Sequence, residues 1–124
     1  METKSILIIE DHMALRLSLS SWLKDLYPSI EIHYAADGEE GLEIANYIKP
    51  DLALIDIGLP GISGFEVTRE IKKQNNYTAI IILTIYEGPE YESESVTAGA
   101  NYFINKKEMF KRLPETINSL LYKN

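Results

Sequence analysis

Short runs of apolar, β-branched residues alternate along this chain with segments in which apolar residues recur at helical spacing. The apolar runs cover residues 5–9, 30–35, 51–55, 79–83 and 102–104. Residues 6–9 and 80–83 contain no polar side chain, which is typical of strands covered on both faces. Residues 30–34 alternate between apolar and polar side chains, which suits a strand at a sheet edge. The pattern predicts five strands.

The segments between and after these strands have the periodicity of amphipathic helices. The apolar residues expected on one face of the first helix are Leu15, Leu19, Trp22, Leu23 and Leu26. Asp37 with Glu40, and Ser63 with Glu66, have the spacing of an N-cap and its reciprocal partner. The second and third helices are therefore expected to begin after Asp37 and Ser63.

The last two helices differ in the strength of their patterns. The last helix is marked by Leu113, Ile117, Leu120 and Leu121. Pro114 is expected near its start, where proline is best tolerated. In residues 88–99 only Tyr91, Val96 and Ala98 offer apolar anchors, among glutamates and serines, so we expect the fourth helix to be the least stable element.

Five strands that alternate with five helices predict an α/β fold, because parallel strands need crossover connections. We therefore expect a five-stranded parallel sheet with helices on both faces. The 124 residues are enough for one domain, residues 1–124, with a single core. No repeat or Gly/Ser-rich linker divides the chain.

Composition excludes several classes of function. The formal net charge of −7 argues against a basic face that grips nucleic acid. No apolar run approaches the roughly 20 residues needed to cross a bilayer, and none is flanked like a signal peptide. The chain has no cysteine, which excludes disulfides, thiolate metal sites and cysteine nucleophiles. A cytoplasmic location is the default expectation.

Five polar residues follow or end four of the predicted strands. Glu10 and Asp11 come after the first, Asp56 after the third, Thr84 ends the fourth, and Lys106 follows the fifth. Ligands of open α/β sheets bind outside the carboxyl ends of the strands. The sequence therefore predicts one site at that edge of the sheet.

The chemistry of these residues is coherent. Three crowded carboxylates repel one another unless a cation neutralises them, and an all-oxygen set suits Mg²⁺. A central aspartate can attack phosphorus and form an aspartyl phosphate. A lysine and a threonine hydroxyl can then stabilise charge on the phosphoryl oxygens. The interpretation is a phosphoryl-transfer site.

The same residues carry a resemblance to a known family. They comprise the pair Glu10-Asp11, the segment 56–64 with the pattern D-x-x-[LM]-P-x-x-x-G, Thr84, and Gly99-Ala100 before Lys106. In this order and spacing, they resemble the receiver domains of two-component response regulators. The resemblance covers residues 5–121 and implies a flavodoxin-like (CheY-like) fold with strand order 2-1-3-4-5.

The resemblance also implies a role for each matching position. Asp56 corresponds to the phosphoacceptor, and Glu10 and Asp11 to the acidic pair that holds Mg²⁺ together with Asp56 and the backbone carbonyl of Gly58. Thr84 and Lys106 correspond to the hydroxyl and the ammonium group that contact the phosphoryl group. Phe103 stands at the position of the switching aromatic residue, which moves together with Thr84.

These roles imply a signalling domain that catalyses only its own phosphorylation and dephosphorylation. The expected partner is a sensor histidine kinase or a phosphotransfer protein. Phosphorylation would alter the surface of the fourth helix, fifth strand and fifth helix, and a phosphorylation-dependent homodimer would be one consequence. Gly58 and Tyr86 occupy positions that tune phosphoryl lifetime in the family. We expect slow self-dephosphorylation, because Gly58 cannot orient water and Tyr86 shields the site.

Asp11-His12, Arg16 and the segment 105–108 resemble the NarL/FixJ (LuxR-type) receivers. In that group a helix-turn-helix output domain follows the receiver, so transcription regulation through an output domain is expected. An excised receiver is favoured over a natural single-domain regulator. His12 itself is interpreted as an exposed polar residue at a helix start, and the glutamates of residues 87–94 as a largely solvated face.

Three alternatives remain open at this point. A haloacid dehalogenase-type phosphotransferase needs a second aspartate two residues after the nucleophile, where this chain has Gly58. A flavodoxin-like binding module needs a Ser/Thr/Gly-rich phosphate loop, where this chain has Glu10-Asp11-His12. A pseudo-receiver would work without phosphorylation, and the complete set of site residues speaks against it.

Overall fold

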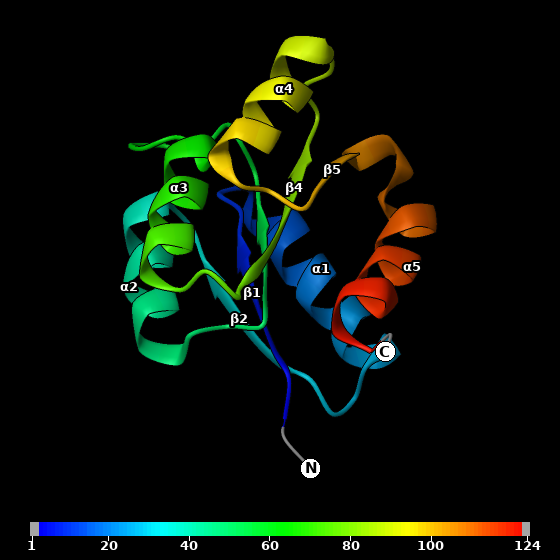
Figure 1. The fold of residues 1–124 in the computed structure, drawn as a ribbon. Coiled ribbons are helices and arrows are strands. Elements are labelled where there is room, and N and C mark those ends of the chain that lie inside the picture. The colour runs from blue at the N-terminus through cyan, green and yellow to red at the C-terminus, as the bar shows by residue number, and fades with distance from the viewer. Residues whose placement is uncertain (1–2, 123–124) are drawn as a thin grey trace.

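Five parallel strands form the central sheet in the computed structural model, which describes residues 3–122 (Figure 1). The strands are β1 (Ser5–Ile9), β2 (Glu31–Ala35), β3 (Leu52–Ile55), β4 (Ala79–Thr84) and β5 (Tyr102–Asn105). Their spatial order is β2-β1-β3-β4-β5. Both the parallel sheet and the strand order that the family resemblance implied are confirmed.

The strands are joined by helices that cover both faces of the sheet (Figure 1). The helices are α1 (Met13–Leu26), α2 (Gly38–Ile48), α3 (Gly64–Gln74), α4 (Pro89–Ala98) and α5 (Met109–Leu121), with a 3-10 turn at Lys106–Glu108 before α5. Helices α1 and α5 lie on one face. Helices α2 and α3 lie on the other, where α4 also packs against α3.

Alternate side chains of the inner strands form two separate cores. Ile6 and Ile8 of β1 point toward α1 and α5, where they meet Leu23 and Ile117. Leu7 and Ile9 point to the opposite face, toward α2 and α3. All four strand residues are almost fully buried, and burying each contributes about 1.5–3 kcal/mol. The continuously apolar runs are strands because both of their faces are covered.

Strand β2 is the exception, as its alternating sequence predicted. It lies at one end of the sheet and pairs with β1 alone. Only Ala35 of its five residues is buried. One of its two hydrogen-bonding edges is therefore turned away from the rest of the sheet.

The predicted N-caps are confirmed. Asp37 accepts a hydrogen bond from the backbone N–H of Glu40 at 2.8 Å, and Ser63 accepts one from Glu66 at 3.3 Å. His12 is exposed, as predicted, and it also caps α1, since its Nδ1 accepts the N–H of Leu15 at 3.2 Å. These caps start α1, α2 and α3 directly after the loops at the carboxyl edge of the sheet.

Three sequence predictions about residues of the helices are wrong. Leu26 is exposed at the end of α1, and Val96 is 73% exposed on α4. Ser95 is buried in α4 instead. Its hydroxyl donates to the carbonyl of Tyr91 at 2.9 Å, so burying Ser95 leaves no unsatisfied polar group. Pro114 lies well inside α5, which therefore lacks the hydrogen bond that a residue at this position would donate to Phe110.

None of the helices within residues 3–122 combines the length and the apolar character needed to cross a membrane.

Candidate functional site

The three predicted acidic residues lie together at the carboxyl edge of the sheet. Ile9 and Ile55 are partners in the ladder between β1 and β3, so the residues that follow them, Glu10 and Asp56, are brought side by side. One carboxylate oxygen from each of Glu10, Asp11 and Asp56 lies within 4.8 Å of the others. Glu10 is 3% exposed and Asp56 is 8% exposed, whereas Asp11 is exposed.

Lys106 is paired with two of these carboxylates. Its Nζ lies 2.8 Å from Oε1 of Glu10 and 3.1 Å from Oδ2 of Asp56. Burial alone would lower the pKa of Lys106. The hydrogen bond to Glu10 and the charges of both carboxylates outweigh that effect, so the pKa lies above its ordinary value. The lysine is therefore held in its charged form beside Asp56.

Local structure directs Lys106 into the site. Asn105 ends β5, and its side-chain oxygen accepts the N–H of Lys107 at 2.9 Å. This contact caps the 3-10 turn that begins at Lys106. The turn directs the side chain of Lys106 inward, while Lys107 remains exposed and pairs with Glu87 at 3.4 Å. The side chain of Lys106 is accordingly 15% exposed, whereas that of Lys107 is 76% exposed.

The loop after β1 is held by contacts that sequence reasoning did not identify. The guanidinium of Arg16 donates to the backbone carbonyl of Glu10 at 2.9 Å and lies 3.5 Å from that of Asp11. The backbone N–H of His12 donates to Oε2 of Glu10 at 3.1 Å. The available signal was the position of Arg16, one helical turn after the cap of α1, from which a long side chain reaches back to the loop.

The loop after β3 fixes the backbone of Asp56. The N–H of Asp56 donates to the carbonyl of Ile9 at 3.2 Å, and the N–H of Gly58 lies 3.4 Å from Oδ1 of Asp56. A Cβ atom on Gly64 would lie only 2.1 Å from the carbonyl oxygen of Asp56. Glycine at position 64, the last residue of the motif in residues 56–64, is therefore required for α3 to begin this close to Asp56.

Thr84 and Phe103 lie on adjacent strands next to this cluster. Thr84 is fully buried at the end of β4, and its Oγ1 accepts the N–H of Tyr86 at 3.4 Å. Among the hydrogen bonds of residues 3–122, none joins the Thr84 hydroxyl to Asp56 or Lys106. Phe103 is half-buried and packs against the core beneath α3 and α4. The structure therefore brings Glu10, Asp11, Asp56 and Lys106 into contact, with Thr84 and Phe103 beside them.

Tyr86 lies over Gly58. A Cβ atom on Gly58 would be 3.3 Å from the tyrosine ring, which is also stacked on Tyr91 of α4 at a centroid distance of 5.3 Å. Tyr86 thus occupies the space that a side chain at position 58 would fill. The ring of Tyr86 therefore covers the loop that follows Asp56.

The charges of the cluster fit a divalent cation. Three carboxylates converge, and within the described part of the chain Lys106 is the only cation that forms ion pairs with them. Three negative charges and one positive charge leave the cluster with a net charge of −2. Mg²⁺ is bound through carboxylate and carbonyl oxygens while keeping several waters, and exposed Asp11 leaves the site open to them.

Comparison with known proteins agrees with this geometry. A family model described as the response regulator receiver domain matches residues 6–118. The match covers most of the chain, and the fold and the acidic cluster are those expected of such a domain. The chain therefore belongs to the receiver domain family of two-component response regulators, as the sequence motifs predicted.

Individual relatives support the same assignment. The chain is 34% identical to the two-component response regulator PhoP of Pseudomonas aeruginosa over 94% of this chain and 51% of that protein. It is 30% identical to the transcriptional regulatory protein LiaR of Bacillus subtilis over 92% of this chain and 54% of that protein. The chain thus spans about half the length of these curated relatives.

Solved structures are similarly close. The response regulator TrrA of Thermotoga maritima, solved in complex with Mg²⁺ and BeF, superposes with a TM-score of 0.85 at 36% identity and covers 96% of this chain and 100% of that one. A LuxR-family DNA-binding response regulator of Staphylococcus aureus superposes with a TM-score of 0.86 at 29% identity, covering 94% and 98%. The LuxR-type resemblance inferred from the sequence is therefore matched by a structural neighbour.

Proposed function

We propose that Asp56 is the phosphoacceptor and that its donor is a phosphohistidine on a sensor histidine kinase or phosphotransfer protein. The observation that carries this proposal is the placement of Lys106, with its Nζ 3.1 Å from Asp56 in a cluster of three carboxylates. A carboxylate can act as a nucleophile toward phosphorus, and an adjacent cation can neutralise charge on the phosphoryl oxygens, which supports this role.

The proposed step transfers one phosphoryl group. A carboxylate oxygen of Asp56 forms a bond to phosphorus while the bond between phosphorus and the donor imidazole nitrogen breaks. The electron pair of that bond stays on the imidazole, which takes up a proton, and the product is an aspartyl phosphate. Lys106 neutralises charge on the phosphoryl oxygens, and the Thr84 hydroxyl on the neighbouring strand can hydrogen-bond to them.

The cofactor of this proposal is Mg²⁺. Glu10, Asp11, Asp56 and the backbone carbonyl of Gly58 would hold it. When bound, it supplies neutralisation of negative charge on the acidic residues and on the transferred group. The all-oxygen donor set and the two uncompensated charges support this choice, as does the Mg²⁺ complex of the TrrA relative.

The output of the proposed switch lies on α4, β5 and α5. Thr84 ends β4 and Phe103 lies on β5, so a phosphoryl group on Asp56 would act on both and alter this surface. A phosphorylation-dependent homodimer or release of an output domain would follow. Because the chain matches about half of relatives such as LiaR, we propose transcription regulation through a domain beyond residues 1–124, in the cytoplasm. A natural single-domain regulator is the second candidate.

The test is phosphorylation with a small-molecule donor. The chain is incubated with acetyl phosphate and Mg²⁺, and its intact mass is measured. Wild type and the control Asp25→Asn should gain one phosphoryl group, while Asp56→Ala should gain none. A folded wild-type chain that forms neither this adduct nor a beryllofluoride complex would contradict the proposal and favour a pseudo-receiver.

A further inference from the structure

The outer edge of β2 carries free backbone hydrogen-bonding groups. Strand β2 is the last strand of the sheet, and within residues 3–122 no segment pairs with its outer edge. The N–H of Glu31 donates to Lys4, and the carbonyl of Ala35 accepts the N–H of Glu10, so both residues use their backbone groups toward β1. An unpaired edge of this kind is a template for another extended chain.

The ladder identifies which groups are free. In a parallel pair each strand offers alternate residues to its neighbour. Glu31, His33 and Ala35 are therefore the residues that pair with β1. The N–H and C=O groups of Ile32 and Tyr34 point away from it. Two donors and two acceptors thus stand in line along the open edge.

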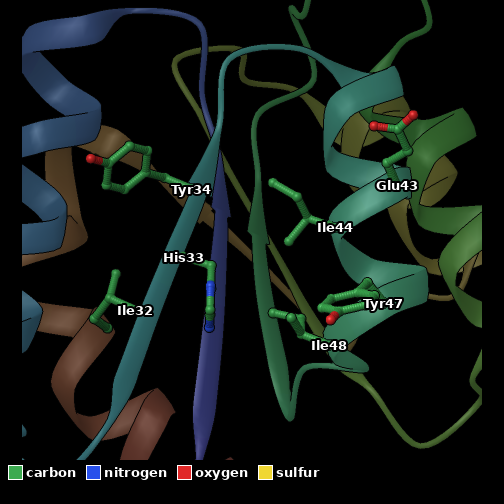
Figure 2. A pocket seen from close by; sticks show the side chains of 7 residues that line it. All are labelled: Ile32, His33, Tyr34, Glu43, Ile44, Tyr47 and Ile48. Carbon is green, nitrogen blue, oxygen red and sulfur yellow. The ribbon is translucent and has the colours of Figure 1, made fainter.

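Hollows lie on both sides of this edge. On the α2 side, a groove of about 730 Å³ is walled by Ile44, Tyr47 and Ile48. Figure 2 shows these side chains extending from α2 toward β2, with Ile32 and Tyr34 on the α1 side of the strand. A second groove of about 600 Å³ lies between β2 and α1, where Leu17 and Lys24 contribute to the wall.

The walls offer apolar surface to side chains that alternate above and below an added strand. Tyr47 is 90% exposed and Tyr34 is 46% exposed, although both are large aromatic residues. A strand paired with Ile32 and Tyr34 would direct alternate side chains into the two grooves, because successive side chains of a strand point to opposite faces. Its apolar residues would then cover both tyrosines.

The charged side chains near the outer edge of β2 indicate which kind of partner would bind there. Glu31 begins β2, and Glu43 lines the groove on the α2 side. Lys24 in the wall on the α1 side donates to the backbone carbonyl of Ile30 at 2.7 Å. A symmetric pair of copies would bring two such sets of carboxylates together, on chains that each carry a net charge of −7. A segment with lysine or arginine beside its apolar residues would instead complement both glutamates.

We propose that the outer edge of β2 is a docking site for an extended, apolar segment of a partner protein that is flanked by basic residues. The segment adds to the sheet as a sixth strand through the backbone groups of Ile32 and Tyr34. Its alternate side chains occupy the grooves against α1 and α2. This recognition mode, strand addition at a sheet edge, takes its affinity from main-chain hydrogen bonds and its specificity from the grooves.

The first experiment uses a synthetic peptide in which valine and threonine alternate between lysines at both ends. The isotope-labelled chain is titrated with this peptide and followed by NMR. The expected result is shifts centred on β2, and slower exchange of the Ile32 and Tyr34 amide hydrogens. A matched peptide with terminal glutamates should bind about tenfold more weakly, because two ion pairs are replaced by repulsion.

Two sets of variants separate strand addition from general attraction. Tyr34→Pro removes one outward N–H, which an edge strand tolerates, while Tyr34→Ala removes the same ring and keeps the N–H. Tyr34→Pro should lose much more affinity than Tyr34→Ala. The exposed double change Glu31→Lys with Glu43→Lys should reverse the preference, so that the glutamate-ended peptide binds better.

Several outcomes would overturn the proposal. Shifts centred on α4 rather than β2 would indicate unspecific attraction to the acidic glutamates. Equal loss in the Tyr34→Pro and Tyr34→Ala variants would exclude pairing through the backbone. Dimers of the chain alone that the Tyr34→Pro substitution abolishes would assign the edge to a second copy. The Asp56→Ala variant should bind the peptide like wild type, so this test is independent of the phosphorylation proposal.

Discussion

The ammonium nitrogen of Lys106 lies 2.8 Å from Oε1 of Glu10. A residue expected to contact a phosphoryl group is thus already paired with a residue expected to hold a metal ion. In this arrangement Lys106 partly neutralises the acidic cluster before any ligand binds. Lys106 therefore connects the proposed metal ligand Glu10 with the proposed phosphoacceptor Asp56.

Replacing Lys106 with methionine should lower both reactivity and stability. The substitution removes the cation beside Asp56, so the rate of phosphorylation by acetyl phosphate should fall about 10²-fold or more, as for loss of a positioned charge-stabilising group. It also leaves two buried carboxylates without a partner, which should lower the free energy of unfolding by roughly 1–3 kcal/mol in Mg²⁺-free buffer. Urea unfolding and the rate of mass gain are the measurements. Lys107→Met, at an exposed neighbour, should change neither; equal effects of the two variants would exclude a special role for Lys106.

Replacing Asp11 with asparagine should have opposite effects with and without Mg²⁺. Without the ion, loss of one of three crowded charges relieves repulsion and should raise the free energy of unfolding. With excess Mg²⁺, wild type gains stability by binding, and the variant should gain less because a ligand is lost. Thermal unfolding in a chelator and in Mg²⁺ measures both effects. Stabilisation of the two proteins by the same amount would show that Asp11 does not bind the ion.

Replacing Tyr86 with alanine should shorten the life of the aspartyl phosphate. The ring of Tyr86 lies over Gly58, beside Asp56, and its removal opens a path for water. We expect dephosphorylation to become about tenfold faster, which corresponds to 1.4 kcal/mol of barrier. Decay of the adduct after removal of acetyl phosphate measures the rate. A rate unchanged in Tyr86→Ala, or a wild-type half-life of seconds, would refute the screening role.

Helix α4 should exchange its amide hydrogens faster than the other helices. Its buried residues are only Ser95 and Ala98, and Val96 faces solvent. Few buried apolar contacts allow local opening at low free energy. Hydrogen exchange followed by NMR should therefore show weaker protection in α4 than in α3 or α5. Protection in α4 equal to that of the core strands would contradict this prediction.

Stability should fall at alkaline pH partly through Tyr27. Burial, and then the charge of Tyr122, raises the pKa of Tyr27 above its ordinary value. The folded state therefore retains this proton more strongly than the unfolded state. The resulting stability is fully present below the unfolded pKa of about 10 and is lost as pH rises through the folded value. Unfolding in urea across this range should show a shallower alkaline decline in Tyr27→Phe than in wild type, whereas exposed Tyr47→Phe should resemble wild type.

Local sequence patterns predicted the buried strands and the helix starts, because both depend on residues that are close together in the chain. The apolar run at residues 6–9 is a strand buried on both faces, and Asp37 and Ser63 cap the helices that they were expected to start. The prediction failed where a residue's environment depends on a distant element. Val96 has a hydrophobic side chain, but the face that α4 turns toward the core carries Ser95 and Ala98 and leaves Val96 exposed.

The residues of the site were also evident from the sequence, since parallel strands deliver the residues after their carboxyl ends to one edge. This rule places Glu10, Asp56 and Lys106 at the same edge of the sheet. Their contacts were not predictable, because the direction of the Lys106 side chain depends on the turn capped by Asn105, which lets it pair with both Glu10 and Asp56. The role of Arg16 at the loop carbonyls was missed for the same reason.

The sequence by itself thus determined the order of the elements and the family, and it indicated which polar residues meet at the carboxyl edge of the sheet. These depend on periodicity and spacing along the chain. The tertiary structure alone decided that Lys106 pairs with Glu10, that Tyr86 covers Gly58, and that β2 presents a free edge between two grooves. The first two contacts join segments far apart in the chain, and the free edge follows from the strand order of the whole sheet, so packing of the domain, and not local preference, sets all three.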